Sequence, residues 1–126
     1  DVRSRRPFPR RVGHEPVGTV VEVGKLVKGY KKGDRITGIF GMGDFAEYVA
    51  VPTGQLLPAP AAIDLVTAAG LPEAFLTAFV NLIIEAQLGS GQRVLIHAGA
   101  SGVGLAAIQV AKVITKGATS AAGPIR

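Results

Sequence analysis

A turn rich in small residues carries the clearest chemical potential in this 126-residue sequence. It reads Ala98-Gly99-Ala100-Ser101-Gly102-Val103-Gly104, and apolar runs flank it at 93–97 and 103–114. Those flanks predict a buried strand, a tight turn and a helix, in that order. Small side chains let a ligand reach the backbone, and the free N–H groups and positive dipole end of a helix favour a phosphate. The spacing is G-x-x-G-x-G rather than G-x-G-x-x-G, so a turn whose glycines serve only helix–strand packing fits the pattern equally well.

The first half of the chain has the pattern of β-structure. Apolar and polar residues alternate through 17–23, and two further short strands are predicted at Arg35–Ile39 and Phe45–Val51. The turn Lys31-Lys32-Gly33-Asp34 is a typical polar reversal between strands. Short strands broken by glycine predict a small barrel or sandwich over residues 13–60.

The second half is predicted to be helical and then α/β. Residues 62–70 form one short predicted helix, and Pro72 suits the first position of another, because its missing N–H needs no partner there. Six apolar side chains then recur with helical spacing and predict a broad stripe packed against a core. These are Phe75, Leu76, Phe79, Val80, Ile83 and Ile84.

Composition narrows the function classes. With no cysteine, disulfides, thiol catalysis and cysteine-bound zinc are excluded, and a cytoplasmic location is expected. Ten of the 14 Lys and Arg residues lie in residues 1–35, which leaves open a surface for RNA or a protein partner, although a solvated basic face is the more ordinary interpretation. The uncharged run 94–111 contains three glycines and polar residues, so a strand–turn–helix is favoured over a membrane span.

Four stretches in the correct order resemble the quinone oxidoreductase branch of the medium-chain dehydrogenase/reductases. They are residues 94–112, residues 71–79, Gly33-Asp34-Arg35, and Phe45-Ala46-Glu47-Tyr48-Val49-Ala50-Val51-Pro52. The resemblance covers about residues 12–118 and implies an α/β chain with a β-rich N-terminal half, a partial GroES-like barrel followed by the first βα unit of a Rossmann-type domain. It further implies a partial GroES-like catalytic domain at 1–60, connecting helices at 61–91 and the start of the dinucleotide-binding domain at 92–126.

The resemblance also implies a function, which is NADPH-dependent hydride transfer to a small-molecule quinone or electron-poor alkene. Thr77 would lie near the nicotinamide, Phe45 and Glu73 would line the substrate pocket, and no catalytic residue is assigned. Ser101 departs from the glycine that is usual in this branch. The residues implied to cradle the cofactor phosphates are Gly99, Ala100, Ser101, Gly102, Val103 and Gly104.

Other interpretations remain open beside this one. A signature of zinc-dependent alcohol dehydrogenases is resembled by the stretch Gly13-His14-Glu15-Pro16-Val17-Gly18. In that interpretation His14 and Glu73 would supply two of the three protein ligands of a catalytic zinc. The third ligand is not visible in the sequence, so no metal is expected. No acid follows Glu85, and Arg126 stands about where a 2′-phosphate partner would, which favours NADPH over NADH. Because the family's chains are longer, a shortened form with weak or no activity, or a homo-oligomer that covers the uncovered edges, is also expected.

Overall fold

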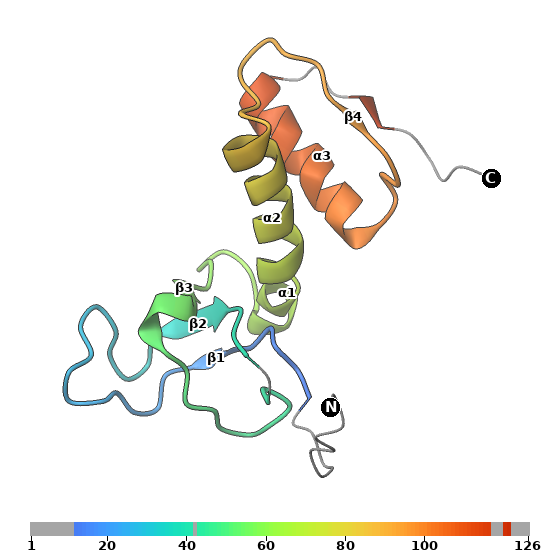
Figure 1. The fold of residues 1–126 in the computed structure, drawn as a ribbon. Coiled ribbons are helices and arrows are strands. Elements are labelled where there is room, and N and C mark those ends of the chain that lie inside the picture. Colours follow the sequence, from blue (N-terminus) through green and yellow to red (C-terminus); the bar gives the residue numbers. More distant parts are fainter. Residues whose placement is uncertain (1–11, 42, 117–119, 122–126) are drawn as a thin grey trace, which may run out of the picture. The chain divides into compact units, whose positions relative to one another are not determined.

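The computed structural model describes residues 12–41, 43–116 and 120–121. The chain divides into two compact units, Asp1–Ala69 and Gly70–Arg126. Figure 1 shows strands β1 to β3 in the first unit and helices α2 and α3 in the second. A β-rich first part followed by an α/β second part confirms the predicted fold class.

A three-stranded antiparallel sheet organises the first unit. Its strands are β1 (Val17–Thr19), β2 (Arg35–Gly38) and β3 (Leu56–Pro58), in the order β1-β2-β3, so β1 is an edge strand. In the central strand, Thr37 lies opposite Val17 of β1 and Leu57 of β3. Thr37 is buried, and its hydroxyl donates a 2.9 Å hydrogen bond to the carbonyl of Pro16, so the buried polar group is satisfied.

The predicted polar reversal before β2 is confirmed. The Lys31 ammonium and backbone N–H both donate to the Asp34 carboxylate, at 2.8 and 2.9 Å. Gly33 has φ of +93°, a left-handed conformation that glycine adopts without steric cost. The hydrogen bond from the Lys31 side chain, followed by the bond from its backbone, lowers the pKa of Asp34.

The predicted strand at Phe45–Val51 is wrong, since these residues form bends and irregular chain. Alternating apolar residues make a strand only where a neighbour pairs with them, and among the described residues no strand pairs with this segment. Phe45 and Tyr48 are consequently 83% and 73% exposed. The third strand is instead β3, which the sequence did not predict because its Pro58 is tolerated only at a sheet edge.

Helix α1 (Leu65–Ala69) closes the first unit within the predicted range 62–70 and contacts β1 and β2. Asp64 precedes it and caps its first turn. The Asp64 carboxylate accepts from the Thr67 N–H at 2.9 Å and from the Thr67 hydroxyl at 2.7 Å. Ala68 is fully buried, so a small side chain sets how closely the helix approaches the sheet.

The second unit begins with a helix that Pro72 opens as predicted. Helix α2 (Pro72–Phe79) continues into η2 (Val80–Glu85), which is a π-helix. The Asn81 side-chain amide donates to the Thr77 carbonyl at 2.8 Å, where the hydrogen-bonding register widens. Polar side chains that bond to the helix backbone often mark such local changes.

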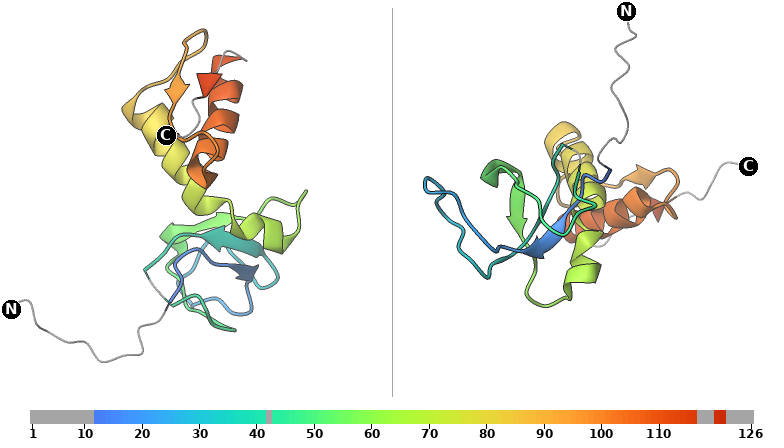
Figure 2. Two further views of the ribbon diagram at one scale, coloured as in Figure 1. Left: turned by 90° about the vertical axis from the view of Figure 1, so that its right-hand side faces the viewer. Right: turned by 90° about the horizontal axis from the view of Figure 1, so that it is seen from below.

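The rest of the second unit is a β-α-β crossover. Strand β4 (Leu95–Ile96) leads through the small-residue turn into α3 (Gly102–Thr115), and β5 (Ser120–Ala121) then pairs in parallel with β4. Figure 2 shows α2 and α3 side by side in both views. The strand and the helix were predicted from their apolar runs, whereas the parallel partner β5 was not.

The core between α2 and α3 is built from small side chains. Buried residues there are Ala78, Ile96, Ala106, Ala107 and Ala111. The predicted apolar stripe is only partly correct: Phe75 packs against this core, but Phe79 and Ile84 are 46% and 56% exposed. Alanines permit close approach of the two helices, and this contact selects a different face of α2 from the one that carries the largest side chains. Among the described residues, no helix has the length and apolar character needed to cross a bilayer.

Candidate cofactor site

The turn between β4 and α3 is closed by hydrogen bonds to a single carbonyl. Strand β4 ends at the buried Ile96, and Ala98 then adopts φ of +53°, in the left-handed region that alanine rarely occupies. The Ala98 carbonyl accepts from the Ser101 N–H at 2.9 Å and from the Ser101 hydroxyl at 2.8 Å. The chain thus reverses within a few residues and presents the start of α3.

Ser101 is the N-cap of α3. Its backbone is extended, and its hydroxyl oxygen accepts from the Gly104 N–H at 3.0 Å. The Leu105 N–H donates to the Ser101 carbonyl at 2.8 Å, which starts the helical bonding pattern. This capping role was not predicted from the sequence, where Ser101 stands out only as a departure from glycine, although serine just before an apolar helix is a recognised capping signal.

Two backbone donors remain at the helix start. The first N–H groups of a helix have no hydrogen-bond partner within the helix. The Ser101 hydroxyl accepts from the N–H of Gly104. Among the described residues, neither Gly102 nor Val103 donates its N–H to an acceptor outside the helix. Both residues are exposed, and the first turn contains no acidic side chain. An anion at this position would therefore meet two free donors and the positive end of the helix dipole.

The glycines of the turn have different structural tasks. A Cβ at Gly102 would meet nothing within 4 Å, so the space beside this residue is open. A Cβ at Gly104 would lie 2.8 and 2.9 Å from the Cα and carbonyl carbon of Gly99, and closer still to the Ala98 oxygen. Gly104 is therefore required for packing of the helix on the turn, whereas Gly102 leaves the backbone accessible. The packing interpretation of the glycines thus accounts for Gly104 and leaves Gly102 unexplained.

The remaining predicted cofactor residue, Thr77, lies in the same unit as the turn. It is half-buried within α2, the helix that packs against α3. Its carbonyl is engaged by the side chain of Asn81. The structure thus brings Thr77 and the turn into one compact unit, through the alanine-rich contact of the two helices.

The predicted substrate-wall residues belong to different units. Phe45 lies in the first unit, and Glu73 lies in the first turn of α2 in the second unit. Both are exposed, as are His14 in the first unit and His97 after β4. Among the residues that the structure describes, no three His, Cys, Asp or Glu side chains come together as a metal site. Arg126 lies outside the described residues.

Comparison with known proteins places the chain among medium-chain dehydrogenases/reductases in fold. Residues 1–61 match the alcohol dehydrogenase GroES-like domain. An alcohol dehydrogenase superfamily protein from Novosphingobium aromaticivorans is 37% identical, with a TM-score of 0.87 over 97% of this chain. The CurK enoyl reductase is 34% identical, with a TM-score of 0.81 over 90% of this chain. The quinone oxidoreductase from Coxiella burnetii is 36% identical, with a TM-score of 0.75 over 90% of this chain.

The chain spans only part of each of these proteins. It covers 38%, 34% and 36% of the three solved structures, respectively. Among curated relatives, a highly reducing polyketide synthase of Emericella nidulans is 41% identical over 103 residues, which are 80% of this chain and 4% of that protein. The matched region is therefore one section of much longer relatives.

Proposed function

We propose that this chain is part of a nicotinamide-dependent oxidoreductase of the medium-chain dehydrogenase/reductase superfamily. The supporting observation is the turn before α3, where Gly102 and Val103 are exposed and, within the part of the chain that the structure describes, donate their N–H groups to no backbone acceptor outside the helix. A cofactor diphosphate carries the charge and the acceptor oxygens that such a turn suits. The relatives named as an enoyl reductase, a quinone oxidoreductase and an alcohol dehydrogenase superfamily protein support the same class of chemistry.

The residues of the turn have different roles in the proposed binding of the diphosphate. Gly102 and Val103 donate their N–H groups, Ser101 fixes the first turn of the helix that carries them, and Gly99 and Gly104 permit the close packing on which that position depends. Ala100 is exposed and small, so it leaves the approach open. Thr77 is proposed to contact the nicotinamide end. The bound dinucleotide supplies the hydride, and the protein supplies position and exclusion of water.

We further propose NADPH as the cofactor and a quinone or electron-poor alkene as the hydride acceptor. NADPH is supported by the resemblance of residues 94–112 to the quinone oxidoreductase branch. The acceptor class is supported by the similarity to proteins named an enoyl reductase and a quinone oxidoreductase. A quinone and an enoyl group each hold an alkene that is electron-poor because a carbonyl is conjugated to it. Phe45 and Glu73 remain the proposed pocket residues. Because hydride chemistry belongs to the cofactor, no acid–base pair is needed among them.

Titration calorimetry with NADPH tests the cofactor proposal. Gly102→Leu should abolish detectable binding, because a branched side chain would occupy the open space beside the two donors. Loss of two charge-assisted hydrogen bonds at about 1.5 kcal/mol each corresponds to at least about a hundredfold weaker binding. Gly54→Leu is the matched control, since a Cβ there also meets nothing within 4 Å but lies in the first unit. NADH should bind more weakly than NADPH.

Two results would contradict the proposal. If wild-type protein and Gly102→Leu gave the same heats, the turn would not be the binding site. If the Gly54→Leu control lost binding as well, the effect would come from the substitution and not from its position. Far-UV circular dichroism of both variants confirms that the helices persist.

A further inference from the structure

A groove of about 900 Å³ lies in the first unit. It is formed by residues 15–24, which include β1, and by the irregular segment 44–51, with single residues from β2 and β3. The turn proposed to bind the cofactor lies in the other unit, whereas Phe45, one of the two proposed substrate-pocket residues, is part of the groove lining.

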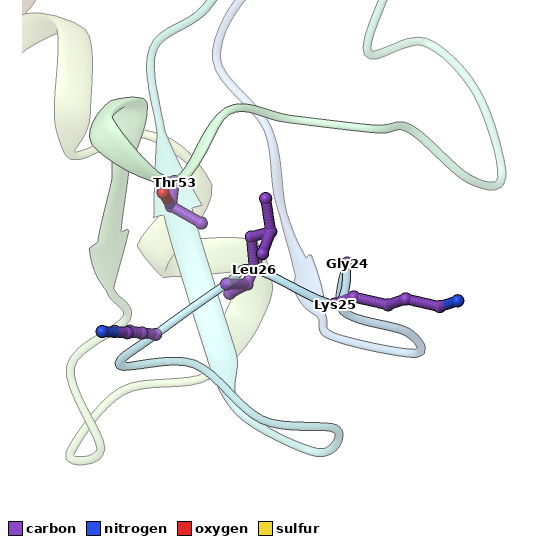
Figure 3. Close-up of a pocket in the computed structure, with 6 residues that line it drawn as sticks. Gly24, Lys25, Leu26 and Thr53 are labelled. Atoms are coloured by element: carbon purple, nitrogen blue, oxygen red, sulfur yellow. The ribbon is translucent and has the colours of Figure 1, made fainter.

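Charge is strongly segregated around this groove. Of the six acidic residues in the described part of the first unit, four line it: Glu15, Glu22, Asp44 and Glu47. None of the five Lys and Arg residues of the same part does so. Lys25 and Lys28 line an adjoining hollow that shares Gly24, Val27 and Thr53 with the groove, and Lys25 points away from Leu26 and Thr53 there (Figure 3). Among the described residues, the side chains of formal charge that line the groove itself are therefore all acidic.

The groove is also lined by large apolar side chains that are exposed to solvent. Val21 and Val23 on one side are 52% and 39% exposed, and Phe45, Tyr48 and Val49 on the other are 83%, 73% and 38% exposed. Contiguous exposed apolar side chains with a polar rim are typical of an interaction surface. A partner for this groove therefore needs apolar groups as well as positive charge.

One backbone edge in the groove has no partner strand among the described residues, and an extended peptide would supply one. Strand β1 is at the edge of its sheet, and among the described residues no strand pairs with its outer side. Such an edge is a template for an added strand.

We propose that this groove binds an extended polypeptide segment of a partner protein, in which basic and apolar residues alternate. The alternation follows from strand geometry, because successive side chains of an added strand point in opposite directions. Arginine or lysine would meet the exposed carboxylates of Glu22 and Glu47, and the apolar residues would cover Tyr48 and Val49. Charge complementarity selects a basic segment over a neutral or acidic one.

Fluorescence anisotropy with a labelled peptide of alternating Arg and Val, and with a Glu and Val counterpart, tests this on the full chain. The basic peptide should bind and the acidic one should not. Glu47→Gln should weaken binding about threefold, the size expected for one exposed ion pair, whereas Glu85→Gln in the second unit should leave it unchanged. Val49→Ser should weaken it severalfold, whereas Val66→Ser, on an exposed residue of α1 outside the groove, should not.

Amide chemical-shift mapping locates the peptide on the protein. The expected shifts fall within residues 15–24 and 44–51. Equal binding of the acidic peptide, equal effects of Glu47→Gln and Glu85→Gln, or shifts confined to residues after Gly70 would each overturn the proposal. Self-association of the protein that perturbs the same amides, with no peptide binding, would assign the groove to a second copy and also overturn it.

Discussion

The N-cap Ser101 offers a way to separate the stability of α3 from its affinity for a phosphate. Ser101→Ala removes the hydroxyl that accepts from Gly104 at 3.0 Å and donates to Ala98 at 2.8 Å. Loss of an N-cap costs about 1 kcal/mol of unfolding free energy. That change corresponds to roughly a fivefold rise in the unfolded fraction of the second unit.

Ser101→Asp should act differently. Its carboxylate can accept from the same Gly104 N–H and places negative charge at the positive end of the helix dipole, so stability should equal or exceed that of the wild type by about 0.3–1 kcal/mol. The same charge should repel a diphosphate. At an effective dielectric constant of about 20 and a separation of about 5 Å, two negative unit charges repel each other by roughly 3 kcal/mol before screening by salt. This repulsion is enough for more than about a tenfold loss of NADPH affinity.

The two units can be followed separately in this assay. The chain has no tryptophan, and both tyrosines, Tyr30 and Tyr48, lie in the first unit. Tyrosine fluorescence therefore reports on the first unit, while the helical dichroism comes mainly from α2, η2 and α3 in the second. Urea unfolding followed by both signals gives the stability, and calorimetry gives the affinity. If Ser101→Asp were as destabilised as Ser101→Ala, or bound NADPH as tightly as wild type, the assignment of Ser101 as the cap of a phosphate-binding helix would be refuted.

Two further substitutions test the packing and capping of the units. Gly104→Ala should destabilise the second unit by about 1–3 kcal/mol, because the added methyl group would press on the Ala98 carbonyl. Urea unfolding followed by circular dichroism measures the change. A higher urea midpoint than in the wild type would contradict the prediction, since it would mean that the higher helix propensity of alanine outweighs the contact. Hydrogen bonds from the Thr67 side chain and backbone lower the pKa of Asp64. The charged carboxylate therefore stabilises the folded state above about pH 4, and this contribution is lost as the pH falls through the lowered pKa. Asp64→Asn should therefore flatten the acid limb of the first unit's stability profile, measured by tyrosine fluorescence between pH 2 and 7, and an unchanged acid limb would contradict it.

Local signals in the sequence were sufficient for the turn and its flanks. The small residues at 98–104, the apolar runs beside them and Pro72 each act within a few residues, and α2 and α3 begin where these signals place them. The segment Phe45–Val51 has the residue pattern of a strand but no neighbouring strand to pair with among the described residues. A local sequence pattern cannot reveal whether such a neighbour exists. The left-handed conformation of Ala98 was equally hidden, because alanine gives no sign that it will adopt it.

The geometry of the candidate site depends on how closely α3 packs against α2 and against the turn. Alanines at the contact between α2 and α3 let the helices approach closely, and Gly104 lets α3 lie directly on the turn. Larger side chains at these positions would bury more apolar area, but they would move the start of α3 away from β4. In the described residues no large side chain is fully buried, while Leu105 and Val113 remain 54% and 78% exposed. The second unit therefore has less hydrophobic stabilisation and closer backbone packing, and that packing fixes the start of α3, where the N–H groups of Gly102 and Val103 lie.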